Sequence, residues 1–178
     1  MAATTSTNTP LFPASLIGPD AASAFPAGYE IRPLQKGDYA KGFIECLRDL
    51  TWMGDMTEPQ FHERYDELDT GGKGPYYYLV VEHAGHIVGT GLVLAEKKFI
   101  HNRCTVGHIE EICIAKDHQS KGLGRLLMNA LNSVADNAGC CKTILNCSEK
   151  NQDFYKKCGY EGSGLEMVNH VRGKTAPQ

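Results

Sequence analysis

The sequence contains no apolar run long enough to cross a membrane, and its first residues, MAATTSTNTPLF, lack the basic flank and long apolar segment of a signal peptide. Positive charge is not in excess either, because the formal net charge is -3 at pH 7. This balance argues against a protein that binds nucleic acid through a domain-wide basic field. We therefore expect a cytoplasmic protein with no membrane span and no nucleic-acid partner.

The cysteines form no C-x-x-C pair, and their number, seven, is odd. Four of them fall inside apolar or helical patterns, where a reduced thiol behaves as a small hydrophobic group: Cys46, Cys113, Cys147 and Cys158. This usage favours a reducing compartment. Neither the pair Cys140 and Cys141 nor the pair His83 and His86 has a third ligand at metal-binding spacing, so we expect no metal site.

No internal repeat is present, and 178 residues are enough for one domain with a sizeable core. Residues 1–27 are rich in Ala, Thr, Ser and Pro without sustained periodicity, which predicts a mostly disordered N-terminal arm. Its apolar residues would let part of the arm dock on the domain: Leu11, Phe12, Leu16, Ile17 and Phe25. We expect a single domain over residues 28–172 and a C-terminal tail over 173–178.

Hydrophobic periodicity and turn signals predict the order of the elements. A first strand over 28–33 precedes two helices, which begin near Asp38 and at Thr57; Gln60 is placed to close a capping box on the second. Next come a hairpin (76–82 and 86–97), a strand (105–115), a long amphipathic helix (123–138), a short strand (142–147), a short helix (151–158) and a last strand (165–171). A meander followed by a strand–helix–strand unit indicates an α+β fold with a mixed central sheet.

The stretch HQSKGLGRLL places two glycines, Gly122 and Gly124, at the start of the long helix. In one interpretation they only permit a tight turn and close packing of the helix on a strand. In the other, they let a phosphate approach backbone N–H groups that the first helical turn leaves unpaired. Lys121 and Arg125 would add positive charge on either side of a pyrophosphate. Spacing alone leaves both interpretations open.

The common nucleotide motifs do not fit, because there is no G-x-x-x-x-G-K-[ST] and the G-x-G lacks the third glycine and the acidic residue of a dinucleotide site. What fits is Gln-x-x-Gly-x-Gly between a strand carrying EEICIA and a long helix, with Gln119, Gly122 and Gly124 at the defining positions. In this respect the chain resembles the GNAT superfamily of N-acetyltransferases. The resemblance implies acetyl-CoA as cosubstrate and a mixed, mostly antiparallel central sheet, flanked by helices, whose central strands splay apart.

Three longer blocks narrow the resemblance: GHIEEICIAKDHQSKGLGRLL, NCSEKNQDFYKKCGY and GLEM. Together they are similar to the eukaryotic glucosamine 6-phosphate N-acetyltransferases of that superfamily, over about Tyr29 to His170. This implies transfer of an acetyl group from acetyl-CoA to the amine of D-glucosamine 6-phosphate, by direct attack on the thioester and without a metal. It also implies a homodimer whose last strand packs across the partner and whose sugar sites draw on both chains.

The resemblance further implies which residues hold the coenzyme. The pantetheine arm would lie between the splayed strands and pair with the backbone of Ile112, Cys113 and Ile114, and an N–H group near Ile112 would face the thioester carbonyl. The other contacts that it implies are Gln119, Ser120, Lys121, Gly122, Leu123, Gly124 and Arg125 around the pyrophosphate, and Asn146, Asn151 and Tyr155 further along the chain.

Glu110 and Glu111 are the carboxylates that the resemblance places at the amine. Neighbours on a strand point to opposite faces unless a bulge intervenes, so only one of them would normally face the substrate, and without the resemblance the pair would pass for a solvated strand edge. Tyr155 would donate its hydroxyl to the leaving sulfur, although a buried tyrosine bonded to some carbonyl is the commoner arrangement. Asn146 stands where relatives have an acid, and an amide cannot accept a proton at neutral pH.

For the sugar phosphate, the resemblance implies Thr51, Lys98, Phe99, Ile100, His101, Glu110, Glu111, Cys141 and Lys142. By composition alone, a short basic run at a hairpin end would be an ordinary solvated surface. An arginine of relatives aligns with His170, and Arg172, two residues on, would keep the same strand face. Which of these two binds the phosphate stays open.

Two other functions fit parts of the sequence. One is a GNAT enzyme that acetylates a different small amine or a protein amine, although Lys98 and Lys142 favour an anionic substrate over a polyamine. The other is a non-catalytic acyl-CoA-binding module. Such a module would keep the glycine motif but lose Tyr155 and the paired glutamates, which this chain retains.

Overall fold

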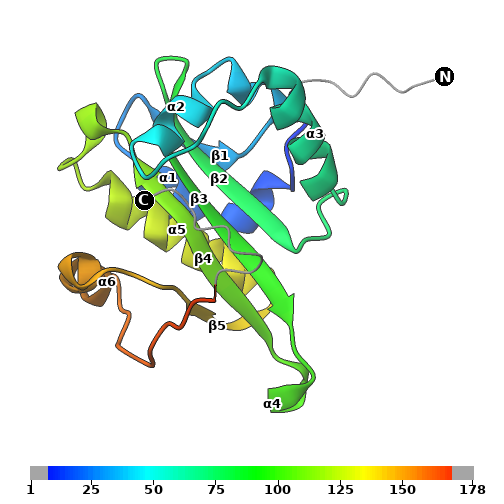
Figure 1. The fold of residues 1–178 in the computed structure, drawn as a ribbon, viewed down its shortest axis with the longest axis vertical. Helices are drawn as coiled ribbons and strands as arrows, with labels where there is room; N and C mark the ends of the chain where they lie inside the picture. Colours follow the sequence, from blue (N-terminus) through cyan, green and yellow to red (C-terminus); the bar gives the residue numbers. More distant parts are fainter. Residues whose placement is uncertain (1–7, 170–178) are drawn as a thin grey trace. The chain divides into compact units, whose positions relative to one another are not determined.

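The computed structural model of the protein describes residues 8–169 (Figure 1). The chain forms two compact units, with the boundary between Ile144 and Leu145. The first unit contains a five-stranded sheet with its helices, and the second contains two short helical segments. Among the described residues, no helix is long and apolar enough to cross a membrane.

A sheet with its strands in chain order organises the first unit. The strands are β1 (Tyr29–Pro33), β2 (Tyr76–His83), β3 (His86–Lys97), β4 (Thr105–Ile114) and β5 (Cys140–Ile144). The first four pair antiparallel, and β5 pairs parallel to β4. The predicted α+β class with a mixed, mostly antiparallel sheet is confirmed.

Two connections explain this topology. β2 and β3 are joined by Ala84 and Gly85, whose φ values of 49° and 81° are of the kind that a two-residue hairpin turn needs. β4 and β5 are parallel, so the chain must cross back over the sheet between them, and α5 (Leu123–Asn137) makes this crossover. The apolar spacing of α5 buries one side of the helix: Leu123, Leu127, Met128, Ala130, Leu131, Val134 and Ala135.

Helices cover both faces of the sheet (Figure 1). α5 lies against one face, where Leu131 comes within 2.8 Å of the point at which a side chain on Gly91 of β3 would begin. α2 (Phe43–Arg48) lies against the other face, where the thiol of Cys113 in β4 donates to the carbonyl of Cys46 at 3.1 Å. The sheet is therefore the middle layer of this unit.

The predicted capping box at the start of α3 (Glu58–Leu68) is confirmed, since the Thr57 N–H donates to the side-chain oxygen of Gln60 at 2.9 Å. The other helical segments of the first unit are short: η1 (Ala14–Ile17), α1 (Pro19–Ser23), η2 (Lys36–Tyr39), α4 (Ile100–Arg103) and η3 (Lys116–His118). α3 packs on η2 and α2, where the ring of Phe61 lies 5.7 Å from that of Tyr39 and 5.5 Å from that of Phe43.

The N-terminal segment is ordered against the sheet from Asn8 onward, so the predicted docking of its apolar residues is confirmed, and it extends over more of the arm than the prediction of a mostly disordered segment allowed. The Leu11 N–H donates to the carbonyl of Leu34 at 2.9 Å, and the Tyr65 hydroxyl donates to the carbonyl of Thr9 at 2.7 Å. Four of the apolar residues of the segment are buried: Leu11, Phe12, Ile17 and Phe25. Burial of these side chains together with satisfied backbone groups explains the order.

Arg32 in β1 and Asp38 in η2 form a buried ion pair, with exposed fractions of 9% and 0%. Arg32 donates to both carboxylate oxygens of Asp38, at 2.9 and 2.7 Å, and also contacts Glu82 in β2, which Lys41 contacts at 2.9 Å. Burial by itself would raise the pKa of Glu82, but hydrogen bonds and charge from Arg32 and Lys41 outweigh it and lower that pKa. The network ties β1, the turn after it and β2 together.

The second unit contains η4 (Glu149–Asn151) and α6 (Gln152–Lys157). The prediction of a last strand over 165–171 is wrong for its described part, because residues 161–169 form neither helix nor strand. A strand needs a partner for its N–H and C=O groups, and no strand in the described part of the chain pairs with this segment. Its apolar side chains are exposed, at 96%, 93% and 74% for Leu165, Met167 and Val168.

We expect Asp38→Ala to lower the free energy of unfolding by about 3–5 kcal/mol, because it leaves the Arg32 guanidinium buried without its main partner. Urea denaturation followed by circular dichroism measures the change. Glu67→Ala is the control, since Glu67 pairs with Arg64 at 2.9 Å on the exposed side of α3. Loss of an exposed pair should cost less than about 1 kcal/mol. Equal losses in the two variants would contradict a structural role for the buried network.

Candidate active site

The β4–β5 pair opens toward the carboxyl end of β4. β5 pairs with β4 only over Thr105–His108, and Ile144, the last residue of β5, lies opposite His108. Beyond this point no described strand pairs with this edge of β4, because β5 ends at Ile144, so an open backbone edge lies where the splay of the strands was expected. An extended ligand can pair with such an edge as an added strand would. The open stretch contains the three residues predicted to bind the pantetheine arm: Ile112, Cys113 and Ile114.

β4 carries one extra residue within this open stretch. In the register of β3 and β4, two residues, Glu111 and Ile112, lie opposite the single residue Gly91. Glu111 takes left-handed backbone, with φ of 53°, as expected for an irregular position in a strand. A Cβ atom on Gly91 would lie 2.7 Å from Cδ1 of Ile112. The missing side chain of Gly91 therefore makes room for Ile112 beneath the bulge.

The bulge brings both glutamates to one face of the sheet. Glu110 lies opposite Leu92, and Leu92 lies opposite Tyr78 of β2, so these three side chains form one cross-strand row. The Tyr78 hydroxyl donates to Oε2 of Glu111 at 3.0 Å, so Glu111 points to that face as well. The alternation argument, by which only one glutamate would face the substrate, holds for a regular strand and fails here because of the extra residue.

Tyr78 is a site residue that the sequence argument missed. Its run, YYYLVV, is typical of a strand and contains no chemical signal of its own. The only clue available was its place in a strand next to the predicted site. Tyr78 and Glu111 are 33 positions apart in the sequence. The pairing of β2 with β3 and of β3 with β4 brings them together in space.

The loop before α5 presents backbone N–H groups. Gly122 is the N-cap, with φ of 79°, and no side chain caps the helix. The helical hydrogen bonds begin with Arg125 and Leu126, which both donate to the carbonyl of Gly122, so the preceding N–H groups are left unused by the helix. No atom lies within 4 Å of the point where a Gly122 side chain would begin. Close packing would require an atom there, so the open space favours the phosphate-binding interpretation.

Side chains of the same loop hold it against the sheet. Gln119 donates from Nε2 to the carbonyl of Ile114 at 2.9 Å, so its amide fixes the end of β4. The Lys121 ammonium lies 3.4 Å from the Tyr29 hydroxyl, which is itself 3.0 Å from Nδ1 of His118. These contacts join β1, the end of β4 and the loop.

The remaining residues of the motif differ in what they can offer a ligand. The side chain of Leu123 is buried in the core, so only its backbone N–H can contact a coenzyme. Gly124 belongs to the first turn of α5. Ser120, which has φ of 61°, and Arg125 are exposed beside the loop.

α4 lies at the opposite end of the sheet from α2 (Figure 1). Lys98 and the segment Phe99–His101 occupy the tip between β3 and β4, where α4 contains left-handed backbone at His101. Thr51 lies three residues after the end of α2 and is exposed. The structure therefore does not bring Thr51 together with the tip residues within one chain.

A disulfide joins Cys104, which follows α4, to Cys141 in β5, with the Cα atoms 5.8 Å apart. The four cysteines expected to be reduced, Cys46, Cys113, Cys147 and Cys158, are free, as is Cys140. The Cys141 thiol is consumed by the bond, so the prediction that it contacts the substrate can hold only for its backbone. The neighbouring Lys142 is exposed.

The other predicted residues belong to the second unit or lie beyond it. Asn146 and Asn151 are exposed, and Asn151 precedes α6 as its N-cap. Tyr155 is half-buried, with its ring 5.1 Å from that of Phe154. His170 and Arg172 lie outside the described residues. Within residues 8–169, no three His, Cys, Asp or Glu side chains come together as metal ligands.

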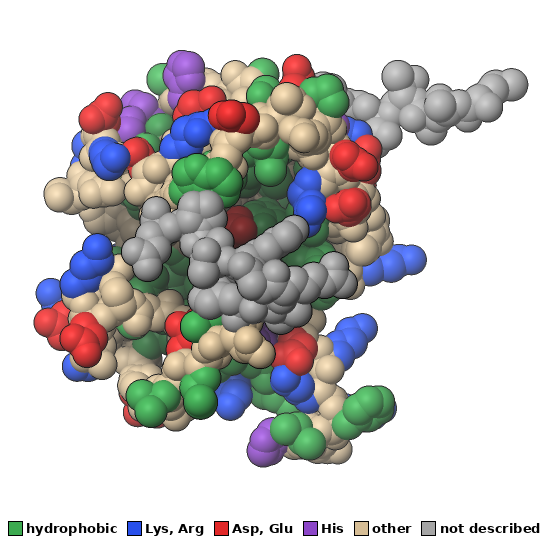
Figure 2. All heavy atoms as spheres, viewed as in Figure 1, with side chains coloured by type: hydrophobic (Ala, Val, Ile, Leu, Met, Phe, Trp, Pro, Cys, Tyr) green, Lys and Arg blue, Asp and Glu red, His purple; other side chains and the backbone are tan. Residues whose placement is uncertain are grey.

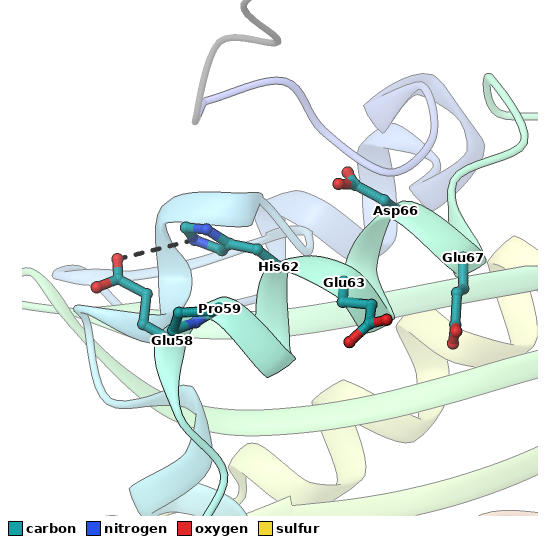
Figure 3. A pocket seen from close by; sticks show the side chains of 6 residues that line it. All are labelled: Glu58, Pro59, His62, Glu63, Asp66 and Glu67. Carbon is teal, nitrogen blue, oxygen red and sulfur yellow. Dashed lines mark ion pairs between the residues drawn. The ribbon is translucent and has the colours of Figure 1, made fainter.

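A hollow on α3 is lined mostly by acidic side chains (Figure 3). His62 lies 3.7 Å from Glu58, and Asp66 and Glu67 follow along the helix. None of the residues predicted from the sequence lines this hollow, so the candidate active site is the open edge of β4 with the loop before α5.

Comparison with known proteins places this geometry in a family. The model of the acetyltransferase (GNAT) family matches residues 43–160. Glucosamine 6-phosphate N-acetyltransferase of Candida albicans is 41% identical over 143 residues, which cover 80% of this chain and 96% of the relative. Glucosamine 6-phosphate N-acetyltransferase 1 of Dictyostelium discoideum is 38% identical over 143 residues, which cover 79% of this chain and 89% of the relative.

A solved structure agrees with these sequence matches. The crystal structure of glucosamine-6-phosphate N-acetyltransferase from Arabidopsis thaliana matches with a TM-score of 0.77 at 36% identity, and the match covers 80% of this chain and 98% of that chain. The chain therefore belongs to the GNAT family of acetyltransferases and, within it, to the glucosamine 6-phosphate N-acetyltransferases.

Proposed function

We propose that this protein transfers the acetyl group of acetyl-CoA to the amine of D-glucosamine 6-phosphate, giving N-acetylglucosamine 6-phosphate, an intermediate on the way to UDP-N-acetylglucosamine, and CoA. The observation that carries the proposal is the open edge of β4 ending at a glycine-capped helix, α5. The strand edge can pair with the extended pantetheine arm, and the helix start can bind the diphosphate. The choice of sugar is supported by the names of the relatives at 36–41% identity.

The backbone supplies most of the proposed grip on the coenzyme. The strand edge at Ile112 and Ile114 pairs with the amide groups of the pantetheine arm. The N–H groups around Gly122 meet the diphosphate, where the partial positive charge of the helix end adds to the attraction. Lys121 and Arg125 supply formal positive charge. The family resemblance adds Asn146 and Asn151 as further proposed contacts.

The reaction joins the amine nitrogen to the thioester carbon and breaks the carbon–sulfur bond. A sugar amine with a pKa of about 8 keeps a neutral fraction at pH 7, so a mild acceptor such as Glu110, Glu111 or water is enough to take its proton. A backbone N–H near Ile112 stabilises the oxyanion of the tetrahedral intermediate. Tyr155 donates its proton to the departing sulfur. Asn146, an amide, takes no proton in this scheme.

The sugar phosphate is bound, in this proposal, by cations and polar groups from two copies of the chain. Lys98, His101 and Lys142 come from the α4 end of one copy, while Thr51 and one of His170 and Arg172 come from the other. The separation of Thr51 from the α4 tip within one chain supports a shared site (Figure 1). Hydrophobic side chains gather on the surface at the α4 end (Figure 2), where Phe99 and Ile100 are 99% and 63% exposed.

We also propose that residues 28–172 act as one acetyltransferase domain in the cytoplasm. The family match over 43–160 supports one domain, because it runs across the boundary between the two units. The five free cysteines support a reducing compartment, whereas the disulfide of Cys104 and Cys141 is of a kind that is rare there.

The function is tested by comparing glucosamine 6-phosphate with glucosamine as acceptor, following thiol release from acetyl-CoA. We expect kcat/KM to be at least about 100-fold higher for the phosphorylated sugar. When glucosamine binds, the cations of the phosphate site are left without an anionic partner, and this weakens binding of the transition state. Lys142→Ala should lower the rate with the phosphorylated sugar and leave the glucosamine rate unchanged. Lys73→Ala, an exposed lysine outside the site, is the control. Equal rates with the two sugars would remove the phosphate site and favour another amine as substrate.

The coenzyme grip is tested by Gly122→Val, measured by calorimetric titration with acetyl-CoA. The new Cβ would stand in the space that the diphosphate needs, so we expect affinity to fall at least about 10-fold. Gly139→Val is a matched control, because Gly139 lies at the other end of α5 with the same φ of 79° and the same open surroundings. Both variants should lose similar stability, of about 1 kcal/mol. Undiminished binding by Gly122→Val would refute the proposed grip.

The shared site is tested by light scattering on the purified protein. We expect a species of about twice the 19.5 kDa chain mass, because the exposed side chains of Leu165 and Met167 would be covered by the partner. Leu165→Asp should shift the population toward monomer and lower the turnover with it. A monomer that keeps full activity would contradict a site built from two chains.

A further inference from the structure

Glu111 occupies a backbone position that an ordinary residue avoids. Its φ of 53° lies in the left-handed region, which costs a residue with a Cβ about 1 kcal/mol. Such a position persists when surrounding contacts hold it. The contact available to the Glu111 side chain is the hydroxyl of Tyr78, which donates to Oε2 at 3.0 Å.

The register of the sheet explains how Tyr78 reaches so far. Tyr78 of β2 and Glu110 of β4 lie in one cross-strand row with Leu92 of β3 between them. The phenol ring therefore extends across β3 and delivers its hydroxyl to the bulge. On its other side the ring meets Phe43 of α2, at a centroid distance of 6.4 Å, which limits where the hydroxyl can go.

Five titratable groups interact in this corner of the site: Glu110, Glu111, Tyr76, Tyr78 and Arg64. Although Glu111 is exposed by surface area, the atoms packed around its carboxyl group desolvate it and raise its pKa, and the charge of Glu110 adds to the rise. The Tyr78 hydrogen bond and the Arg64 guanidinium of α3 act against this rise. Burial raises the pKa of Tyr78 well above its ordinary value, with the charge of Glu111 adding to it, so its hydroxyl stays a proton donor throughout the neutral range.

We propose that Tyr78 is a positioning residue for the acetyl transfer, holding the carboxylate of Glu111 ionised and aimed at the amine. The inference rests on the proposed function, because the amine is the group that Glu111 would hold. The Tyr78 proton stays on oxygen throughout, and no bond to the substrate is formed by this residue. What Tyr78 sets is the pH below which Glu111 ceases to accept a hydrogen bond from the amine.

Tyr78→Phe removes the donor and keeps the ring. Without the hydrogen bond the ionised form of Glu111 is less stable, so its pKa rises. The part of the acid limb of the kcat/KM profile that is due to Glu111, which lies below the limb of the sugar amine, then moves to higher pH by about one unit. We expect a loss of about 10-fold below the limb and only about threefold or less above it. Tyr76→Phe is the matched control, since Tyr76 lies two residues earlier in β2 and on the same face. Its profile should coincide with that of the wild type.

Glu111→Gln provides the second comparison, because a neutral amide has no titration to shift. If Tyr78 acts through Glu111, adding Tyr78→Phe to Glu111→Gln should change kcat/KM by less than about twofold and move no limb. A purely structural tyrosine would lower the rate equally in both backgrounds. Equal losses, or an unmoved limb in Tyr78→Phe, would overturn the proposal.

Carbon-13 NMR titration of the Glu111 carboxyl separates this inference from the proposed function. It needs no turnover, so it remains informative even if glucosamine 6-phosphate is not the substrate. We expect the Glu111 resonance to titrate about one pH unit higher in Tyr78→Phe than in the wild type and in Tyr76→Phe. Coincident titrations in all three proteins would refute the role of Tyr78 whatever amine the enzyme acetylates.

Discussion

The extra residue of β4 opposite Gly91 is the feature on which the site depends. An unbulged β4 would alternate, so Glu110 and Glu111 would point to opposite faces and could not act on one amine. The bulge turns Glu111 to the side of Glu110 and bends the strand that carries Ile112. It lies just beyond His108, where β5 stops pairing. The glutamates and the open backbone edge therefore occur on the same few residues of one strand.

The second constraint is the distance between that edge and the start of α5. The connecting segment consists of η3 followed by the glycine loop. Contacts of Gln119 and Lys121 hold this segment against the sheet. Because Gln119 bonds to the carbonyl of Ile114, the end of the strand and the glycine loop keep a set spacing. In the proposed function, a coenzyme that spans both would meet a preformed surface, which lowers the ordering cost of binding.

Outside the site, stability comes from features with no part in the chemistry. The N-terminal segment covers one side of the sheet with Leu11 and Phe12, and the pair of Arg32 and Asp38 fixes the turn after β1. The disulfide of Cys104 and Cys141 joins the α4 end to β5 by a bond between residues 37 positions apart. These contacts hold the two ends of the sheet on which the proposed sugar and coenzyme contacts lie.

Local signals in the sequence determined much of this protein: the capping box at Thr57, the hairpin at Ala84 and Gly85, the glycine start of α5 and the motif that marks the family. Each of these depends on atoms a few residues apart, so the sequence expresses it directly. Only the tertiary structure decided the bulge, the partner of Tyr78 and the bond of Cys141. Those depend on strand register and on packing between residues distant in the chain, where one residue of slip changes every neighbour.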